Sequence, residues 1–204
     1  MKKNKGFTLV EMIVVVSIFA ILLGILIPSL NSILGFRVQK ATNSIAAALD
    51  QTKIEASGRL VGAMKLEKRT DGYYISYILD RGKVDGKDNI KVNENEEKIA
   101  PSKTAISYYI EGDSTERYLT EEDSGIVITY DRASGAFLPL LKADGWENFD
   151  VLKEVQNTDL YLTSMQLDGD QYCSKIVVKG GSRTRTITLI PETGKYTITA
   201  GETS

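Results

Sequence analysis

Residues 7–27, FTLVEMIVVVSIFAILLGILI, decide how this chain of 204 residues is built. Glu11 carries the only formal charge in residues 6–36, and the uncharged stretch at residues 12–36 is about 25 residues long. A membrane-spanning helix needs roughly 20 mainly apolar residues, so this segment can span a bilayer. Three lysines and no acid stand in the first five residues. They predict that the N-terminal end stays cytoplasmic and the rest of the chain lies outside.

Glu11 separates three interpretations of this segment. A cleaved secretory signal needs a small-x-small site after the apolar run, and residues 29–32 (SLNS) offer a poor one. A plain signal anchor fits the hydropathy but leaves Glu11 unexplained. A carboxylate in the apolar layer costs about 2.5–3.5 kcal/mol on insertion scales, and such a residue usually has a partner and a function. This cost favours a third interpretation.

The sequence KGFTLVE at residues 5–11, placed before a long apolar run, closely resembles the processing site of type IV prepilins. The resemblance implies that a prepilin peptidase cuts after Gly6 and methylates the new N-terminal residue, Phe7. It also implies that Glu11, five places into the mature chain, helps subunits to enter a filament. Pro28, twenty-two places into the mature chain, matches another common feature of that family.

The chemistry of this motif can also be argued from its residues. Gly6 has no side chain and suits a protease pocket that excludes a Cβ, and Thr8 is a candidate N-cap. Cleavage would leave an α-amino group on Phe7 with a pKa near 7.7–8, which is largely cationic. The ammonium of a neighbouring subunit would neutralise Glu11 only in the correct register, so the buried charge would select for assembly. In the alternative, Glu11 is a carboxylate at headgroup level that the helix dipole favours.

The apolar pattern continues beyond Pro28 as an amphipathic helix. Apolar or small residues recur in steps of three or four at Leu30, Leu34, Val38, Ala41, Ile45, Leu49, Thr52, Ala56 and Leu60. We expect one helix over residues 7–58, roughly 78 Å long at about 1.5 Å per residue, with Gly58 as a left-handed C-cap residue. Residues 7–34 would form the transmembrane segment or filament core, and residues 35–58 the amphipathic half. Pro28 removes a backbone hydrogen bond and is expected to kink the helix, although membrane helices also tolerate proline.

Residues 59–204 predict an extracellular head with an antiparallel β-sheet. The expected fold class is therefore α+β, a long N-terminal helix packed on that sheet, which is similar to a pilin. The runs expected as strands are Tyr73–Leu79, Ala105–Ile110, Ile126–Tyr130, Ala136–Leu140, Lys175–Lys179, Thr184–Ile190 and Lys195–Thr199. Residues 180–182 and 191–194 are expected turns, and a short helix is expected near Trp146–Glu154. Alternation in Thr184–Ile190 predicts one polar and one buried face.

Two polar stretches interrupt the predicted strands. Residues 81–100 are charged and are expected to form a solvated loop or an extended hairpin, and residues 111–125 an acidic loop. Neither stretch has the spacing of an EF-hand, and residues 82–87 do not match a P-loop. We therefore expect solvated loops and no metal site.

Four basic residues cluster in sequence near the C-terminus: Lys175, Lys179, Arg183 and Arg185. If they share one face, they could contact DNA phosphates, as a DNA-uptake filament would require. The competing interpretation is an ordinary solvated strand face, because no aromatic residues are interleaved with these charges.

The composition excludes several functional classes. The chain has no His, which excludes imidazole-based catalytic triads and imidazole-ligated metals. Its one Cys, Cys173, cannot form an internal disulfide, so the disulfide loop common in Gram-negative pilins cannot form. A net charge of −2 argues against a nucleic-acid binder driven by overall charge. No carboxylate spacing suggests acid–base catalysis, so we expect no enzyme and no cofactor.

The resemblance implies a structural subunit of a type IV pilus, preferably a minor pilin, in a cell-surface filament for adhesion or motility. The alternatives are a pseudopilin of a type II secretion or competence DNA-uptake system, and a membrane-anchored extracellular binding domain that does not polymerise. The expected partners are other pilin subunits, the prepilin peptidase and methyltransferase, the assembly platform and ATPase, and cytoplasmic membrane lipid, with DNA less favoured. Loss of the leader, residues 1–6, lowers the basic count from 25 to 22 against 27 acidic residues, a side-chain net charge of −5.

Overall fold

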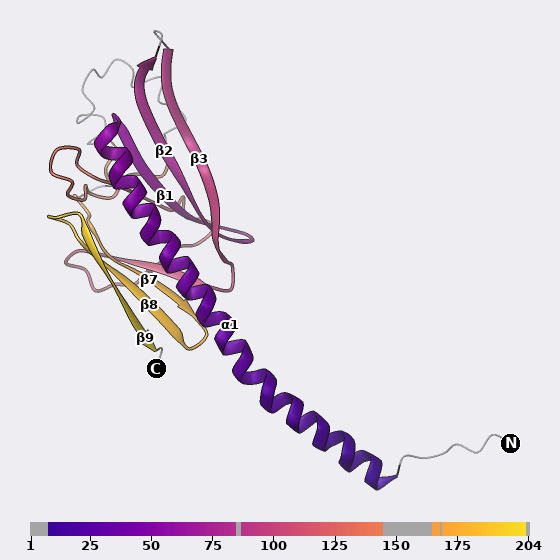
Figure 1. The fold of residues 1–204 in the computed structure, drawn as a ribbon. Helices are drawn as coiled ribbons and strands as arrows, with labels where there is room; N and C mark the ends of the chain where they lie inside the picture. The colour runs from indigo at the N-terminus through magenta and orange to yellow at the C-terminus, as the bar shows by residue number, and fades with distance from the viewer. Residues whose placement is uncertain (1–7, 85–86, 145–164, 168, 203–204) are drawn as a thin grey trace.

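A long helix and two antiparallel sheets make up the part of the chain that the computed structural model describes, residues 8–84, 87–144, 165–167 and 169–202. The helix, α1 (Leu9–Gly58), leads the chain, and the strands follow it (Figure 1). The expected α+β fold class, a long N-terminal helix on an antiparallel β head, is confirmed. The β head consists of two sheets, where the sequence suggested one.

The two sheets lie under the helix and share one interior. Sheet A contains, in spatial order, β3 (Lys87–Pro101), β2 (Gly72–Val84), β1 (Val61–Arg69) and β6 (Ile126–Thr129). Sheet B contains β5 (Arg117–Tyr118), β4 (Ala105–Ile110), β7 (Cys173–Gly180), β8 (Arg183–Ile190) and β9 (Lys195–Glu202). Tyr73 of β2 connects them, because the backbone N–H of Ile106 in β4 donates to its hydroxyl oxygen at 3.3 Å.

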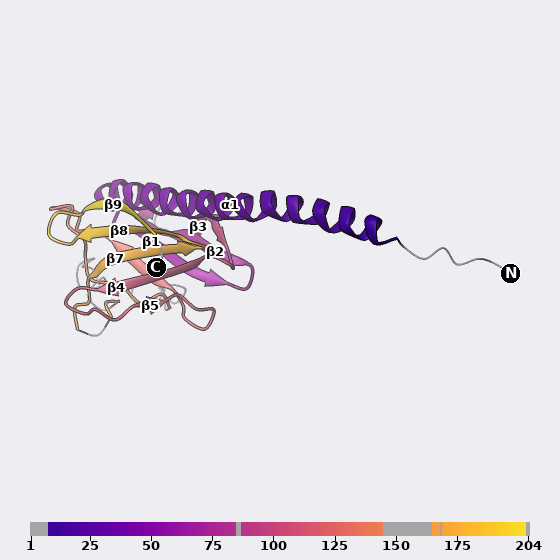
Figure 2. The same ribbon diagram turned by 90° about the horizontal axis from the view of Figure 1, so that it is seen from below.

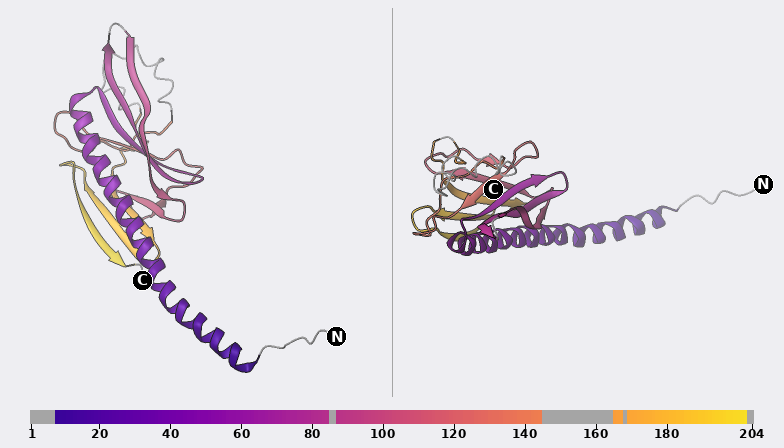
Figure 3. Two further views of the ribbon diagram at one scale, coloured as in Figure 1. Left: turned by 45° about the vertical axis from the view of Figure 1, so that its right-hand side comes forward. Right: turned by 90° about the horizontal axis from the view of Figure 1, so that it is seen from above.

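The second half of α1 lies across both sheets (Figures 2 and 3), and its apolar stripe packs against them. The buried members of the predicted stripe are Val38, Ala41, Ile45, Leu49, Thr52 and Ala56. Two buried threonines on this face satisfy their hydroxyls within the helix: Thr42 donates to the carbonyl of Val38 at 2.8 Å, and Thr52 to that of Ala48 at 2.6 Å. The stripe can therefore bury two polar residues without an unpaired hydroxyl.

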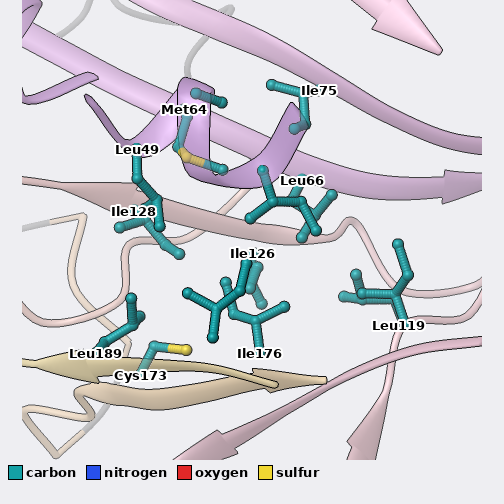
Figure 4. Close-up of a cluster of buried hydrophobic side chains, with 14 of the residues drawn as sticks. Leu49, Met64, Leu66, Ile75, Leu119, Ile126, Ile128, Cys173, Ile176 and Leu189 are labelled. Atoms are coloured by element: carbon teal, nitrogen blue, oxygen red, sulfur yellow. The ribbon is translucent and has the colours of Figure 1, made fainter. Parts of the chain in front are cut away.

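One hydrophobic core joins the helix to the two sheets, as Figure 4 shows. Leu49 of α1, Leu66 of β1 and Ile176 of β7 belong to it, and each is fully buried. Burying a side chain of this size contributes about 1.5–3 kcal/mol. A smaller cluster, which includes Val127 and Leu141, covers the other face of sheet A.

The first half of α1 projects away from the sheets (Figures 1 and 2). Residues 8–24, which we call the N-terminal arm, expose their large apolar side chains on all sides, from 43% for Val15 to 76% for Leu9. The helix continues unbroken through residue 28, so the proline there does not end it, and the expected kink stays a prediction. Within the residues that the structure describes, no helical stretch combines the length and hydropathy needed to cross a membrane.

The end of α1 differs from the prediction. The helix does stop at Gly58, but Gly58 is not left-handed, and the next residue, Arg59, is extended (φ −130°, ψ 168°). The chain enters sheet A at once, because the N–H of Leu60 donates to the carbonyl of Asp80 in β2 at 2.9 Å. Strand pairing therefore replaces the expected glycine cap.

Two strand predictions need correction, and one open alternative is decided. β1 was not expected at all. The stretch at residues 81–100 is largely strand, so of its two expected forms the extended hairpin of β2 and β3 is the one observed. Residues 136–140 form only an isolated bridge between Phe137 and Tyr130, because Pro139 has no N–H to donate to a ladder. The helix expected near Trp146–Glu154 lies outside the described residues.

The two C-terminal turns dock on the helix. Both occur where they are predicted, with Gly181 and Gly194 in left-handed conformation (φ 62° and 59°). The first turn touches α1 closely, since a Cβ on Gly180 would lie 2.7 Å from Cγ2 of Val38. The second is held by Lys53 of α1, whose Nζ donates to the carbonyl of Gly194 at 3.1 Å.

Tyr196 of β9 adds a third contact with α1. Its hydroxyl donates to Oδ2 of Asp50 at 2.9 Å and lies 3.3 Å from the carbonyl oxygen of Ala46. Burial and the hydrogen bond to the carboxylate raise the pKa of Tyr196 to about 12. The last strand of the chain is thus attached to the first helix.

Candidate functional site

The N-terminal motif forms a capping box at the start of α1. Thr8 is extended (φ −81°, ψ 153°), and its Oγ1 accepts the backbone N–H of Glu11 at 3.3 Å. In return, Oε2 of Glu11 accepts the backbone N–H of Thr8 at 2.8 Å and its hydroxyl at 2.9 Å. This reciprocal arrangement satisfies two backbone donors that the first helical turn would otherwise leave open.

The capping box gives Glu11 partners within its own chain. Its carboxylate lies in the first turn of α1, where the helix dipole favours a negative charge. The alternative role considered from the sequence, a carboxylate stabilised by the helix N-terminus, therefore exists in the single chain. Both bonds from Thr8 go to Oε2, and a carboxylate has further acceptor sites, so a partner in an assembly can bind Glu11 without displacing Thr8.

The N-terminal arm is otherwise an apolar rod. Ser17, a polar residue in its middle, donates its hydroxyl to the carbonyl of Ile13 at 2.8 Å and so presents no free donor. Exposed side chains such as Ile18, Phe19 and Ile21 surround it. A rod of this kind has no partner within the described chain and gains most from lipid or from copies of itself.

Two predicted site residues, Gly6 and Phe7, lie outside the described residues, so cleavage and methylation stay predictions. Pro28 lies within the helical backbone of α1.

The four basic residues proposed for DNA contact do not share one face. In the β7–β8 register, Arg185 pairs with Val178 and Arg183 with Gly180, which places both arginines on the helix side of sheet B. Lys175 and Lys179 alternate with these positions and lie on the opposite side. The cluster in sequence is thus divided by the period of the strands.

The structure also places aromatic rings beside the two lysines, which the sequence does not indicate. Lys175 Nζ lies 5.9 Å from the ring centre of Tyr109, and Lys179 Nζ lies 5.6 Å from that of Tyr118. Lys179 is also paired with Glu116 at 2.6 Å, which neutralises it. One of the two lysines on this face is therefore already engaged.

The acidic segment at residues 111–125 is tied to the head by internal bonds. Hydrogen bonds from Thr115 and Arg117 lower the pKa of Asp113 to about 2. Glu116 accepts from the Ser107 hydroxyl at 2.6 Å as well as from Lys179. No cluster of Cys, Asp and Glu side chains within the described ranges is arranged to hold a metal ion.

Cys173 is buried, unpaired and part of the main core. Burial raises the pKa of its thiol to about 12, so the thiolate is scarce at neutral pH. Cys173 therefore acts as a small apolar residue of the core.

Comparison with known proteins places the N-terminal segment in a family. Residues 1–27 match the family described as the prokaryotic N-terminal methylation motif, which is consistent with type IV pilins and pseudopilins. The resemblance stated from the sequence is thereby confirmed for this segment. Neither the curated proteins nor the solved structures yielded a match to the chain.

Proposed function

We propose that this chain is a filament subunit of the type IV pilus class, cut after Gly6, methylated at Phe7 and assembled through its N-terminal helix. The observation that carries the proposal is the methylation motif at residues 1–27 joined to an exposed apolar arm that leads into a folded head. Motif and arm together support a pilin-like or pseudopilin role. Such a subunit is anchored in the cytoplasmic membrane before it enters an extracellular filament.

Assembly would then add a charged partner at Glu11. In the single chain, the carboxylate is bonded to Thr8 at 2.8 and 2.9 Å. Cleavage creates an ammonium on Phe7, next to the capping residue. The Phe7 ammonium of a neighbouring subunit forms a charged pair with Glu11, which is stronger than a bond to a neutral hydroxyl. Only the correct stagger between subunits brings these two groups together.

Within this class we favour a minor pilin in a filament for adhesion or motility, because the head carries long irregular connections such as residues 111–125. These loops would supply the contacts that distinguish one subunit from another. DNA as a ligand is less favoured, since the basic residues are divided between two faces of sheet B.

A membrane-anchored domain that does not polymerise is the second candidate, and one observation favours it. Glu11 is already bonded to Thr8, so an anchor need not have a partner for it. Mass spectrometry of the N-terminus, on the membrane fraction and on filaments sheared from the cell surface, separates the candidates. N-methyl-Phe7 in both fractions supports the filament subunit, whereas an intact leader confined to membranes supports the anchor.

Replacement of Glu11 by Gln tests the charged pair directly. The amide oxygen can still accept the N–H of Thr8, so we expect normal cleavage and a normal melting temperature of the head. The charged pair is lost, and its loss in a buried setting is expected to cost about 1.5–3 kcal/mol, or roughly a tenfold or greater fall in the ratio of filament to membrane subunit. Ser17→Ala, in the same arm, is the matched control. Normal incorporation of the Gln variant would refute the role given to Glu11.

A further inference from the structure

The head has a basic end at the point where the first half of α1 leaves it (Figures 1 and 2). The turn between β7 and β8 lies at this end, since a Cβ on Gly181 would lie 2.9 Å from Cδ1 of Leu34 in α1. The turn between β3 and β4 lies beside it, because Ala105 at the start of β4 pairs with Lys179 near the end of β7. Both turns therefore border the segment of α1 around residue 34.

Each of these segments carries basic residues and no acid. Residues 33–40, 101–104 and 180–183 contain no Asp or Glu. We call their four basic residues the basic collar: Arg37 and Lys40 in α1, Lys103 in the β3–β4 turn, and Arg183 at the β7–β8 turn. All four are exposed, and Arg37, Lys40 and Lys103 have no hydrogen bond or ion pair with another described residue. These three ammonium and guanidinium groups are therefore available to an anion.

Two acids near this end do not cancel the basic collar. Asp71, in the β1–β2 turn, is paired with Lys98 at 2.6 Å. Glu202 is opposite Arg183 in the β8–β9 register and can offset only one of the four positive charges. The basic collar thus keeps a net positive charge.

Arg183 lies against the helix. A Cβ on Gly35 would lie 3.3 Å from Cγ of Arg183 and 3.9 Å from its Nε, so the glycine leaves room for this side chain beside α1. Arg37 follows Gly35 by two residues, or about 3 Å along the helix axis. Arginines from opposite ends of the sequence therefore lie at one level of the helix.

The length of α1 places this level at the surface of a bilayer. Arg37 comes 26 residues after Glu11, or about 39 Å along the helix, and no residue between them carries a formal charge. A bilayer measures about 40–45 Å with its headgroup layers included. When Glu11 lies among the headgroups of the inner leaflet, Arg37 therefore lies among those of the outer leaflet.

The exposed apolar surface of α1 ends at the same level. Ile33 is 47% exposed and Phe36, directly before Arg37, is 70% exposed. From there to Ile54, no large hydrophobic side chain of the helix is exposed. Such a change from apolar to basic side chains is expected where the hydrocarbon layer meets the headgroups.

We propose that the basic collar binds the phosphates of anionic lipids in the outer leaflet of the cytoplasmic membrane while the subunit awaits assembly. The inference rests on the proposed function, because it requires α1 to be anchored in a bilayer. A guanidinium group binds phosphate through two parallel hydrogen bonds, and an ammonium adds a point charge. The lipids would hold the head on the membrane surface and would be released when the subunit enters a filament.

The test uses the full chain in phosphatidylcholine vesicles, with or without a quarter of phosphatidylglycerol. A fluorophore is attached either to Ser102→Cys, next to the basic collar, or to Thr193→Cys, in the turn that Lys53 holds at the other end of the head. The native Cys173 is buried and stays unlabelled. Nitroxides on lipid headgroups then quench a label that lies at the membrane surface.

We expect quenching at residue 102 and little at residue 193, and only with phosphatidylglycerol. A basic residue near an anionic surface strengthens binding roughly fivefold, so Arg37→Gln and Arg183→Gln should each lower the ratio of docked to free heads about fivefold. Salt at about 1 M should abolish docking, because the Debye length falls to about 3 Å. Arg183→Lys keeps the charge and should retain most of the docking.

Arg132→Gln is the matched control, because it removes an exposed arginine from the turn that packs against Gly194, at the other end of the head. It should leave docking unchanged, and near-UV circular dichroism verifies the fold of each variant. Quenching that does not depend on phosphatidylglycerol, or equal ratios for Arg37→Gln and Arg132→Gln, would overturn the proposal.

Flotation of the vesicles separates this result from a failure of the proposed function. A chain that floats with the vesicles while its label at residue 102 stays unquenched would overturn the lipid contact alone. A chain that does not float with them would overturn the membrane-anchored stage of the proposed function as well.

Discussion

Replacement of Gly194 by Ala should destabilise the head more than the same replacement at a turn glycine whose surroundings are open or flexible. Gly194 lies in the turn between β8 and β9 with φ 59°, where an L residue costs about 1–2 kcal/mol. A Cβ there would lie 1.9 Å from the carbonyl oxygen of Gly135 and 3.1 Å from Nζ of Lys53. The contact with Gly135 is with backbone, so a turn must move, and overpacking of this kind adds about 1–3 kcal/mol.

Two other glycines separate these contributions. Gly112 has a similar backbone (φ 77°) but nothing within 4 Å of its Cβ position, so Gly112→Ala measures the conformational cost alone. Gly201 has neither a left-handed φ nor a close neighbour, and Gly201→Ala should change stability by less than about 0.5 kcal/mol. The difference between Gly194→Ala and Gly112→Ala is therefore the cost of the clash, about 2 kcal/mol.

Thermal unfolding of the full chain in mild detergent, followed by near-UV circular dichroism, measures this difference. For a protein of this size, about 2 kcal/mol corresponds to a gap of about 4–8 °C between the two melting temperatures. Equal melting temperatures for Gly194→Ala and Gly112→Ala would refute the close packing of the Gly194 turn against the backbone of Gly135.

Leu49→Ala should lower the free energy of unfolding by about 2–5 kcal/mol. Ile54→Ala, on the exposed face of the same helix, should lower it by less than about 0.5 kcal/mol. Urea titration measures both changes. The raised pKa of Tyr196 means that its contribution to stability is complete below about pH 10 and is lost as the pH rises toward 12. In Tyr196→Phe the free energy of unfolding should therefore decrease less between about pH 10 and pH 12 than in the unaltered chain. Asp50→Ala should have the same effect. Burial opposes ionisation of Glu67, but hydrogen bonds from its two basic neighbours lower its pKa below 4.5, so its contribution is present above that pH and is lost as the pH falls. Glu67→Gln should therefore make the melting temperature fall less steeply as the pH is lowered.

The helix and its buried face can be predicted because their signals are local. The step of three or four that places Ile45 and Leu49 in the core is written in a continuous stretch of sequence. The alternation in β8 is equally plain, with Ile187 and Leu189 buried and the intervening threonines on the other side.

Two strands of sheet A, β1 and β3, are harder to predict because their charged residues are paired across or along the sheet. β1 carries Lys65, Glu67 and Arg69 on one face, so it does not look like a buried strand. Glu67 is nevertheless buried, bridged by Lys65 at 2.6 Å and by Arg69 at 2.5 Å. β3 is a charged edge strand with bulges, features that protect an edge from unwanted pairing.

The candidate sites also differ in whether their signal is local in the sequence. The motif that ends at Glu11 is contiguous and can be recognised, and so can Thr8 as a cap. A surface groove beside α1, by contrast, is lined by residues far apart in sequence, such as Asn43 and Asn95, which only the fold brings together. The separation of Arg185 from Lys179 likewise depends on strand register, which a cluster in sequence does not reveal.

Because the end of the chain attaches to the first helix, these contacts form only late in synthesis. Lys53 bonds to the carbonyl of Thr193, 140 positions later in the chain. At about 5–20 residues per second, a ribosome needs roughly 7–28 s to make that interval. For most of that time the stripe of α1 has no β7–β8 surface to cover it. The contact between Tyr196 of β9 and Asp50 of α1 forms later still, so truncation before Tyr196 would leave the helix without it.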